Sequence, residues 1–153
     1  MATPRFTTYS FKQYTIAFGP IIMDGYQAGE GCTVEHNADA YTMEVGIDGK
    51  AVRSQVLNRS ARITINLSQT SACNDLLSAI YLLGVTGQDA NGVPVGPGAD
   101  VMPFIIRDNN GRSVFTAAES WIARAPDLSL DQPSTNRAWV FDVAFLDEFH
   151  GGN

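Results

Sequence analysis

The sequence predicts a mainly β fold, an antiparallel β-sandwich or β-barrel with one flanking α-helix. Its 153 residues, 44% hydrophobic and 17% charged, have the length and composition of a single domain over residues 1–153. Short segments that alternate between apolar and polar residues are separated by glycine, proline and asparagine turns, as in all-β domains. The spacing of an amphipathic helix is convincing in one segment, residues 72–83.

The first half of the chain predicts a strand followed by a hairpin. Residues 11–18 alternate in polarity and are followed by a Gly-Pro pair, so we expect a strand that ends there. Residues 41–47 alternate again, and residues 51–57 return with the same period. Between them lies Asp48-Gly49, a pair typical of a type I′ turn.

Residues 61–67 predict a strand with one buried face and one face in water. The apolar side chains of this strand and of the hairpin should pack under the helix, namely Met43, Val45, Ile63, Ile65 and Leu67. The opposite, polar face should then carry Thr42, Glu44, Arg62, Thr64 and Asn66. On that face Arg62 needs an acidic neighbour, Glu44 or another carboxylate.

The second half of the chain predicts the helix, a loop and three strands. Ser71 is a suitable capping residue for the helix and Gly84 a suitable end. Residues 84–100 contain five glycines and two prolines, which predicts a surface loop. Strands are expected over residues 102–107, 113–123 and 137–146, with a turn at Asn110-Gly111 between the first two.

Side chains that could perform chemistry are scarce in this sequence. Cys32 and Cys73 have no further cysteine near them, so neither a zinc site nor a redox motif is expected. His36 and His150 are the two imidazoles, and His36 lies in a polar segment typical of a solvated strand end. Nucleophile-elbow, phosphate-loop and metal-binding motifs are absent. The sequence therefore predicts no enzymatic activity, no cofactor and no metal site.

The net charge of -6 is the opposite of what a tight nucleic-acid binder carries. No apolar run is long enough to span a membrane and no secretory signal is evident, so we expect a protein that acts where it is made or leaves by lysis.

The charges also fall into two blocks. Residues 24–48 carry six acidic side chains and no Lys or Arg, whereas residues 49–62 carry four basic side chains and no acid. Two interpretations stay open. Neighbouring strands could pair these charges within one subunit, at ~0.2–1 kcal/mol per pair. The blocks could instead meet head to tail between copies of the chain.

Five segments keep an order and spacing that point to a known family. The central ones are EVGIDGKAVRS, RITINL and QTSACNDLL, at residues 44–54, 62–67 and 69–77, and YSFK (9–12) and RAWVF (137–141) lie near the ends. Together they resemble the tail tube proteins of contractile-tailed bacteriophages, which are related in architecture to type VI secretion tube proteins. None of these segments is a chemical motif, so their order along the chain carries the resemblance.

The resemblance implies a structural virion protein of the tail tube. Hexameric rings would stack into a hollow tube inside a contractile sheath, and double-stranded DNA would pass through it into the host without specific binding. The implied partners are further copies of the chain, the tail sheath protein, and the tape-measure, baseplate and tail-terminator proteins, with assembly in the host cytoplasm. An acidic wall that repels phosphate agrees with the composition.

Two surfaces are predicted for such a tube. We expect the hairpin over residues 48–57 to reach a neighbouring ring, with inter-ring or inter-subunit contacts from Asp48, Gly49, Lys50, Arg53 and Arg59. We expect a net negative lumen, lined by the polar face of the central strands with Thr42, Glu44, Arg62, Thr64 and Asn66.

Other function classes stay open at this point. The tube could belong to a contractile injection system that translocates protein. A small-molecule-binding β-barrel would use Trp121 and Trp139 to line an apolar pocket. An enzyme would depend on His36, which has no identified catalytic partner.

Overall fold

The computed structural model describes residues 8–152 of the chain. The strands of its main sheet are β1 (Tyr14–Phe18), β2 (Ile21–Ile22), β3 (Cys32–His36), β6 (Ala61–Ser68), β7 (Met102–Asp108), β8 (Val114–Arg124), β9 (Asn136–Val143) and β10 (Asp147–Phe149). They are ordered β2-β1-β7-β8-β9-β6-β3, all antiparallel, with β10 paired to β8 beside this path. Over the described residues the structure is 43% strand and 12% helix, which confirms the predicted mainly β fold class.

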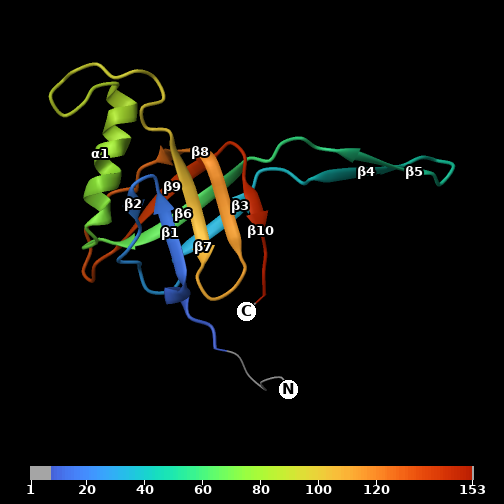
Figure 1. Cartoon of the computed structure of the whole chain (residues 1–153), viewed down its shortest axis with the longest axis horizontal. Helices are drawn as coiled ribbons and strands as arrows, with labels where there is room; N and C mark the ends of the chain where they lie inside the picture. The colour runs from blue at the N-terminus through green and yellow to red at the C-terminus, as the bar shows by residue number, and fades with distance from the viewer. Residues whose placement is uncertain (1–7, 153) are drawn as a thin grey trace.

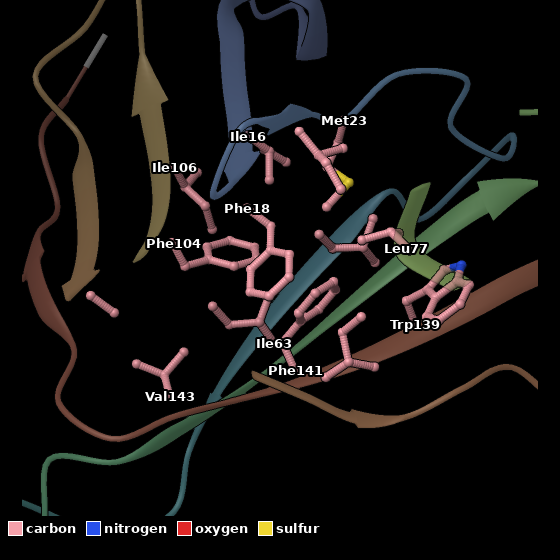
Figure 2. Packing of buried hydrophobic residues seen from close by; sticks show 14 of the residues in the cluster. Ile16, Phe18, Met23, Ile63, Leu77, Phe104, Ile106, Trp139, Phe141 and Val143 are labelled. Carbon is pink, nitrogen blue, oxygen red and sulfur yellow. The ribbon is translucent and has the colours of Figure 1, made fainter. Parts of the chain in front are cut away.

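The main sheet is twisted and curls around one core (Figure 1). Phe18 of β1 and Phe141 of β9 are separated in the sheet by two strands, β7 and β8, yet their ring centroids lie 5.0 Å from each other. Phe104 of β7 lies 5.2 Å from the same Phe141 ring, so three strands meet in one aromatic cluster (Figure 2). Burial of each such side chain stabilises the fold by ~1.5–3 kcal/mol.

Strand β6 has the alternation that the sequence predicts. Ile63, Ile65 and Leu67 are fully buried, and the residues between them point to the other side of the sheet. Trp139 of β9 belongs to the same core and is 3% exposed (Figure 2). Trp121 lies outside this buried cluster.

Helix α1 (Cys73–Thr86) begins one residue later than the sequence predicts. Ala72 occupies the N-cap position, and the hydroxyl of Ser71 accepts a hydrogen bond from the backbone N–H of Cys73 at 3.3 Å. The same hydroxyl donates to the carbonyl of Asp24 at 2.6 Å, which ties the helix start to the chain after β2. Among residues 8–152, no helix is long and apolar enough to cross a bilayer.

The helix ends later and packs less than the sequence predicts. Gly84 does not terminate it. The helix runs on to Thr86 and stops at Gly87, which adopts φ +65° and donates its N–H to the carbonyl of Leu83. Of its apolar residues, Leu77 is buried against the sheet, whereas Leu76 is 53% exposed. The following residues 87–101 form the predicted loop.

The predicted hairpin forms, but it is not part of the core. Strands β4 (Tyr41–Val45) and β5 (Ala51–Gln55) pair only with each other and project from the body (Figure 1). Met43 and Val45 are 70% and 60% exposed, so the prediction that they pack under the helix is wrong. Their alternation reflects an apolar face that the described residues of this chain leave uncovered.

The hairpin turn also differs from the predicted type I′ turn. Gly49 has φ +83°, but Asp48 does not have a positive φ, which a type I′ turn requires of it. Gly49 donates its N–H to the carbonyl of Gly46, and Gly46 donates to the carbonyl of Lys50. The connection is therefore a three-residue loop, in which one glycine in the left-handed region closes an ordinary turn.

Two predicted strands have different bounds. Residues 11–13 form the 3-10 turn η1 (Phe11–Gln13), so β1 begins only at Tyr14. Strand β9 ends at Val143, and the chain then bends so that Leu146 is buried and Phe145 is 61% exposed. The bend allows residues 147–149 to return as β10, which the sequence does not predict.

Candidate functional site

The projecting hairpin has two chemically different faces. In its register Met43 lies opposite Arg53, and Val45 lies opposite Ala51. With Tyr41, these residues form what we call the apolar face of the hairpin, where the Arg53 guanidinium stacks 4.4 Å from the centroid of the Tyr41 ring. The other face carries Thr42, Glu44, Val52 and Ser54.

The structure separates the predicted contact residues into a tip and a root. Asp48, Gly49 and Lys50 lie together at the tip, where Lys50 Nζ is 3.8 Å from Asp48 Oδ2. Arg53 lies along the shaft, and all four are exposed. Arg59 lies past the end of β5, at the root, where the hairpin joins the body.

The root is held by the C-terminal strand β10. Arg59 Nη2 donates to Asp147 Oδ1 at 2.7 Å and to the carbonyl of Leu146 at 3.2 Å. On the other arm, His36 Nε2 lies 2.7 Å from Glu148 Oε1. Two neighbouring residues of β10 therefore hold both arms of the hairpin. Sequence analysis missed them because they lie 88 and 112 positions from their partners.

The polar face of β6 carries an ion pair. Arg62 Nε donates to Asp142 Oδ1 of β9 at 3.0 Å, and this hydrogen bond raises the pKa of the arginine. Glu35 of β3 is the register partner of Arg62 on the other side. The expected acidic neighbour of Arg62 therefore exists, but it is Asp142 and not Glu44.

The remaining polar positions lie in two places. Thr64 and Asn66 share the face of Arg62, and Asn66 Nδ2 donates to the carbonyl of Glu30 at 3.0 Å. Thr42 and Glu44 belong to the separate two-stranded sheet, so they do not share a sheet face with the β6 residues. A single wall from all five residues is therefore not formed within one copy.

The basic block is largely paired within the subunit. Arg59 and Arg62 form ion pairs with Asp147 and Asp142, so the interpretation of pairing within one copy holds for these two side chains. Their partners come from the C-terminal part of the chain and not from the acidic block at residues 24–48. Exposed pairs of this kind contribute ~0–1 kcal/mol each.

The two cysteines are free thiols. Cys73 is buried. Burial raises the pKa of Cys32 to about 12, so the Cys32 thiol carries little reactive thiolate at neutral pH. Within residues 8–152, no group of three or more His, Cys, Asp or Glu side chains is placed to hold a metal ion.

These features describe a structural subunit that is made for assembly. Strand β3 ends the sheet path, and no described strand pairs with its outer edge. Open edges and uncovered apolar hairpins are normally protected in a protein that stays monomeric.

The chain belongs to the bacteriophage tail tube proteins. The family described as Bacteriophage PhiTE tail tube protein matches residues 1–151. A curated relative, "Structural protein ORF10" of Pseudomonas phage KPP10, is 29% identical over 155 residues, which cover 97% of this chain and 85% of the relative. The chain is thus a structural protein of a phage tail tube, and a tail tube is a component of the virion.

Solved structures share the fold at low sequence identity. The cap of the anti-feeding prophage tube matches with a TM-score of 0.59 and 6% identity, over 97% of this chain and 95% of that chain. A chain of the PVC sheath-tube complex in its extended state, from an extracellular contractile injection system, matches with a TM-score of 0.58 and 8% identity, over 93% of this chain and 91% of that chain. A chain of a native gene transfer agent virion matches with a TM-score of 0.57 and 12% identity, over 94% of this chain and 100% of that chain.

Proposed function

We propose that this chain forms hexameric rings that stack into the inner tail tube, and that double-stranded DNA passes through the lumen during ejection. The observation that carries the proposal is the projecting hairpin, whose strands β4 and β5 are exposed along their whole length. A two-stranded hairpin alone is marginally stable in water. A neighbouring copy would supply the packing that it lacks.

Ring closure would use the open edge of β3. Asn66 donates its N–H to the carbonyl of Gly31, and Asn37 donates to the carbonyl of Ser60, which fixes the hydrogen-bonding phase of this strand pair. The backbone groups of Cys32, Val34 and His36 consequently point away from β6, toward the open edge. A strand from the next copy that pairs there would continue the sheet around the ring.

Ring stacking would use the hairpin. Asp48, Gly49 and Lys50 at the tip and Arg53 on the shaft are free to contact a subunit of the next ring. Arg59 is engaged with Asp147 at the root, so we assign it the role of holding the hairpin in the direction of that ring. The contact is heterologous and does not close, so it can be repeated along a tube.

The lumen would be lined by the outer face of β3, β6 and β9. Across these strands Glu35, Arg62 and Asp142 form one row with a net charge of -1 (Glu -1, Arg +1, Asp -1). Thr64 and Asn66 continue the face without charge. DNA would meet a weakly negative wall in every copy and no basic site on which to dwell.

The polar face of the hairpin, with Thr42 and Glu44, would extend this wall toward the next ring. The outside of the tube would face the tail sheath, and its ends would meet the baseplate and terminator proteins. The tape-measure protein would occupy the lumen before DNA does, and assembly would take place in the host cytoplasm. The descriptions of two structural neighbours name a sheath and a terminator, which supports the proposal of these two partners.

A tube that translocates protein is the second candidate, because two neighbours come from an anti-feeding prophage and an extracellular injection system. The phage family and the phage relative favour DNA. Particles that carry this tube should therefore be attached to DNA-filled heads.

Negative-stain microscopy of the purified protein tests the proposal. We expect rings and tubes with a central channel. A protein that stays monomeric at high concentration would contradict it. Assembled tubes should also fail to retain DNA in a filter-binding assay, and salt-dependent micromolar binding would overturn the assignment of a negative lumen.

A further inference from the structure

Helix α1 has an outer surface that the body does not cover. Its sequence contains one charged residue, Asp75, and no Lys or Arg. Leu82 and Val85 are 56% and 64% exposed. A helix that is apolar around most of its circumference is normally buried, so this surface lacks a partner in the single chain.

A groove runs between this surface and the loop that follows the helix. Its volume is about 670 Å³, and its lining includes Ala79, Leu83 and Thr86 of the helix and Asp89 and Gly92 of the loop. This volume lies within the ~300–1,000 Å³ of pockets that accept apolar ligands. Side chains of a protein partner could therefore enter it.

The loop wall of the groove is fixed by hydrogen bonds. Asp89 Oδ1 accepts the backbone N–H groups of Asn91 and Val93, both at 2.9 Å. The N–H of Val95 donates to the carbonyl of Gly87 at 2.8 Å, which closes the loop onto the helix end. The groove is therefore built by the chain itself and does not depend on a partner for its shape.

We propose that this groove receives the apolar face of the hairpin from a copy of the chain in the next ring. The inference rests on the proposed stacking of rings and names the surface that receives the hairpin. The groove and the hairpin lie at opposite ends of the long axis of the molecule, so a chain cannot fill its own groove (Figure 1). Copies can instead join head to tail, each giving a hairpin and receiving one.

The chemistry of the two surfaces is complementary. On the hairpin, Tyr41, Met43 and Val45 are exposed apolar side chains, and the surface of the helix beside the groove is also apolar. Residues 73–101 carry three acidic side chains and no basic one, while Arg53 lies beside Met43 on the hairpin. An arginine at the edge of the docked hairpin would thus face acidic groups such as Asp89.

Crosslinking in assembled tubes tests this contact. The variant Met43→Cys/Ala79→Cys places one thiol on the apolar face and one in the groove. With a short bismaleimide it should give a ladder of covalent oligomers that extends beyond the ring size seen by microscopy. The matched control Thr42→Cys/Ala79→Cys has its thiol on the opposite hairpin face and should give no ladder. The single variants measure any background from Cys32 and Cys73.

Each outcome decides the inference. Tubes of Met43→Cys/Ala79→Cys that yield no ladder, or one equal to the control, overturn the groove as the docking site while the tube function stands. A ladder that stops at the ring size overturns the placement in the next ring. Failure of the unmodified chain to form tubes would instead contradict the proposed function.

A second measurement covers variants that do not assemble. Ala79→Lys puts a positive charge where Arg53 should dock, and we expect at least a tenfold loss of tubes with an unchanged circular dichroism spectrum. Ser78→Lys, next to it on the side of Trp139, is the control and should assemble normally. Normal tubes from Ala79→Lys would overturn the inference.

Discussion

His36 Nε2 lies 2.7 Å from Glu148 Oε1, although 112 positions separate the two residues in the chain. One residue before Glu148, Asp147 accepts a hydrogen bond from Arg59 on the other arm of the hairpin. The C-terminal strand therefore holds the root of the hairpin from both sides. The residues that contact the root therefore lie far from the hairpin in sequence.

The root contacts should matter more for assembly than for stability. In Asp147→Asn/Glu148→Gln both side chains keep their shape and lose their charge. We expect the free energy of unfolding to fall by no more than about 1–2 kcal/mol, because exposed ion pairs contribute ~0–1 kcal/mol each. Hydrogen exchange of residues 41–55 should become faster, and tubes should form more slowly. Asp131→Asn, an exposed acid in the segment between β8 and β9, is the control and should change neither measurement.

Charge reversal on the hairpin should stop tube growth. Lys50→Glu/Arg53→Glu removes the cation that stacks on Tyr41 and creates a run of negative charge beside Asp48. We expect a folded subunit by circular dichroism and a large loss of tubes by sedimentation. Tubes of normal length would show that the hairpin is not a stacking element.

Core and hairpin substitutions should separate folding from assembly. Phe141→Ala removes a fully buried ring and should lower the free energy of unfolding by ~3–5 kcal/mol in urea. Met43→Ala should change it by about 0.5 kcal/mol or less, because Met43 is exposed in the single chain. Met43→Ala should nevertheless weaken tube formation. A large loss of monomer stability in Met43→Ala would place this side chain against its own body.

Cys32 should make the stability of the monomer depend on pH in the alkaline range. Its pKa is about 12 in the folded chain against 9.0 for the free group. The unfolded chain therefore releases this proton first, and unfolding becomes more favourable above pH 9, by up to about 1.4 kcal/mol per pH unit from this group. The free energy of unfolding, measured with urea between pH 8 and 11, should fall less steeply with pH for Cys32→Ala than for the unmodified chain. Equal slopes would contradict the buried state of the thiol.

Local patterns predicted the elements but not the partners that they find. The alternation in β6 gave the correct buried face because the strand lies inside the sheet, where one side meets the core. The same alternation in Tyr41–Val45 was assigned to the core of this chain. Periodicity reports that an apolar face exists, and it cannot tell whether that face is buried within the chain or between copies.

The helix end and the root show two further limits. Gly84 and Gly87 are both acceptable terminators by sequence, and the helix continues to the second because Gly84 tolerates helical backbone and packs against Asp100. The pairing of Glu148 with His36 has no local signal, since it depends on the long-range return of β10 to β8. Order and spacing of short segments identified the family, which local chemistry could not do.

A reconstruction of the assembled tube at side-chain resolution would show both proposed surfaces at once. We expect residues 41–55 of each copy to lie against a subunit of the adjacent ring, with Tyr41, Met43 and Val45 buried at that contact. The face with Arg62, Thr64 and Asn66 should line the channel. A reconstruction in which the hairpin lies within its own ring or points into solvent, or in which this β6 face lies on the outside of the tube, would contradict these expectations.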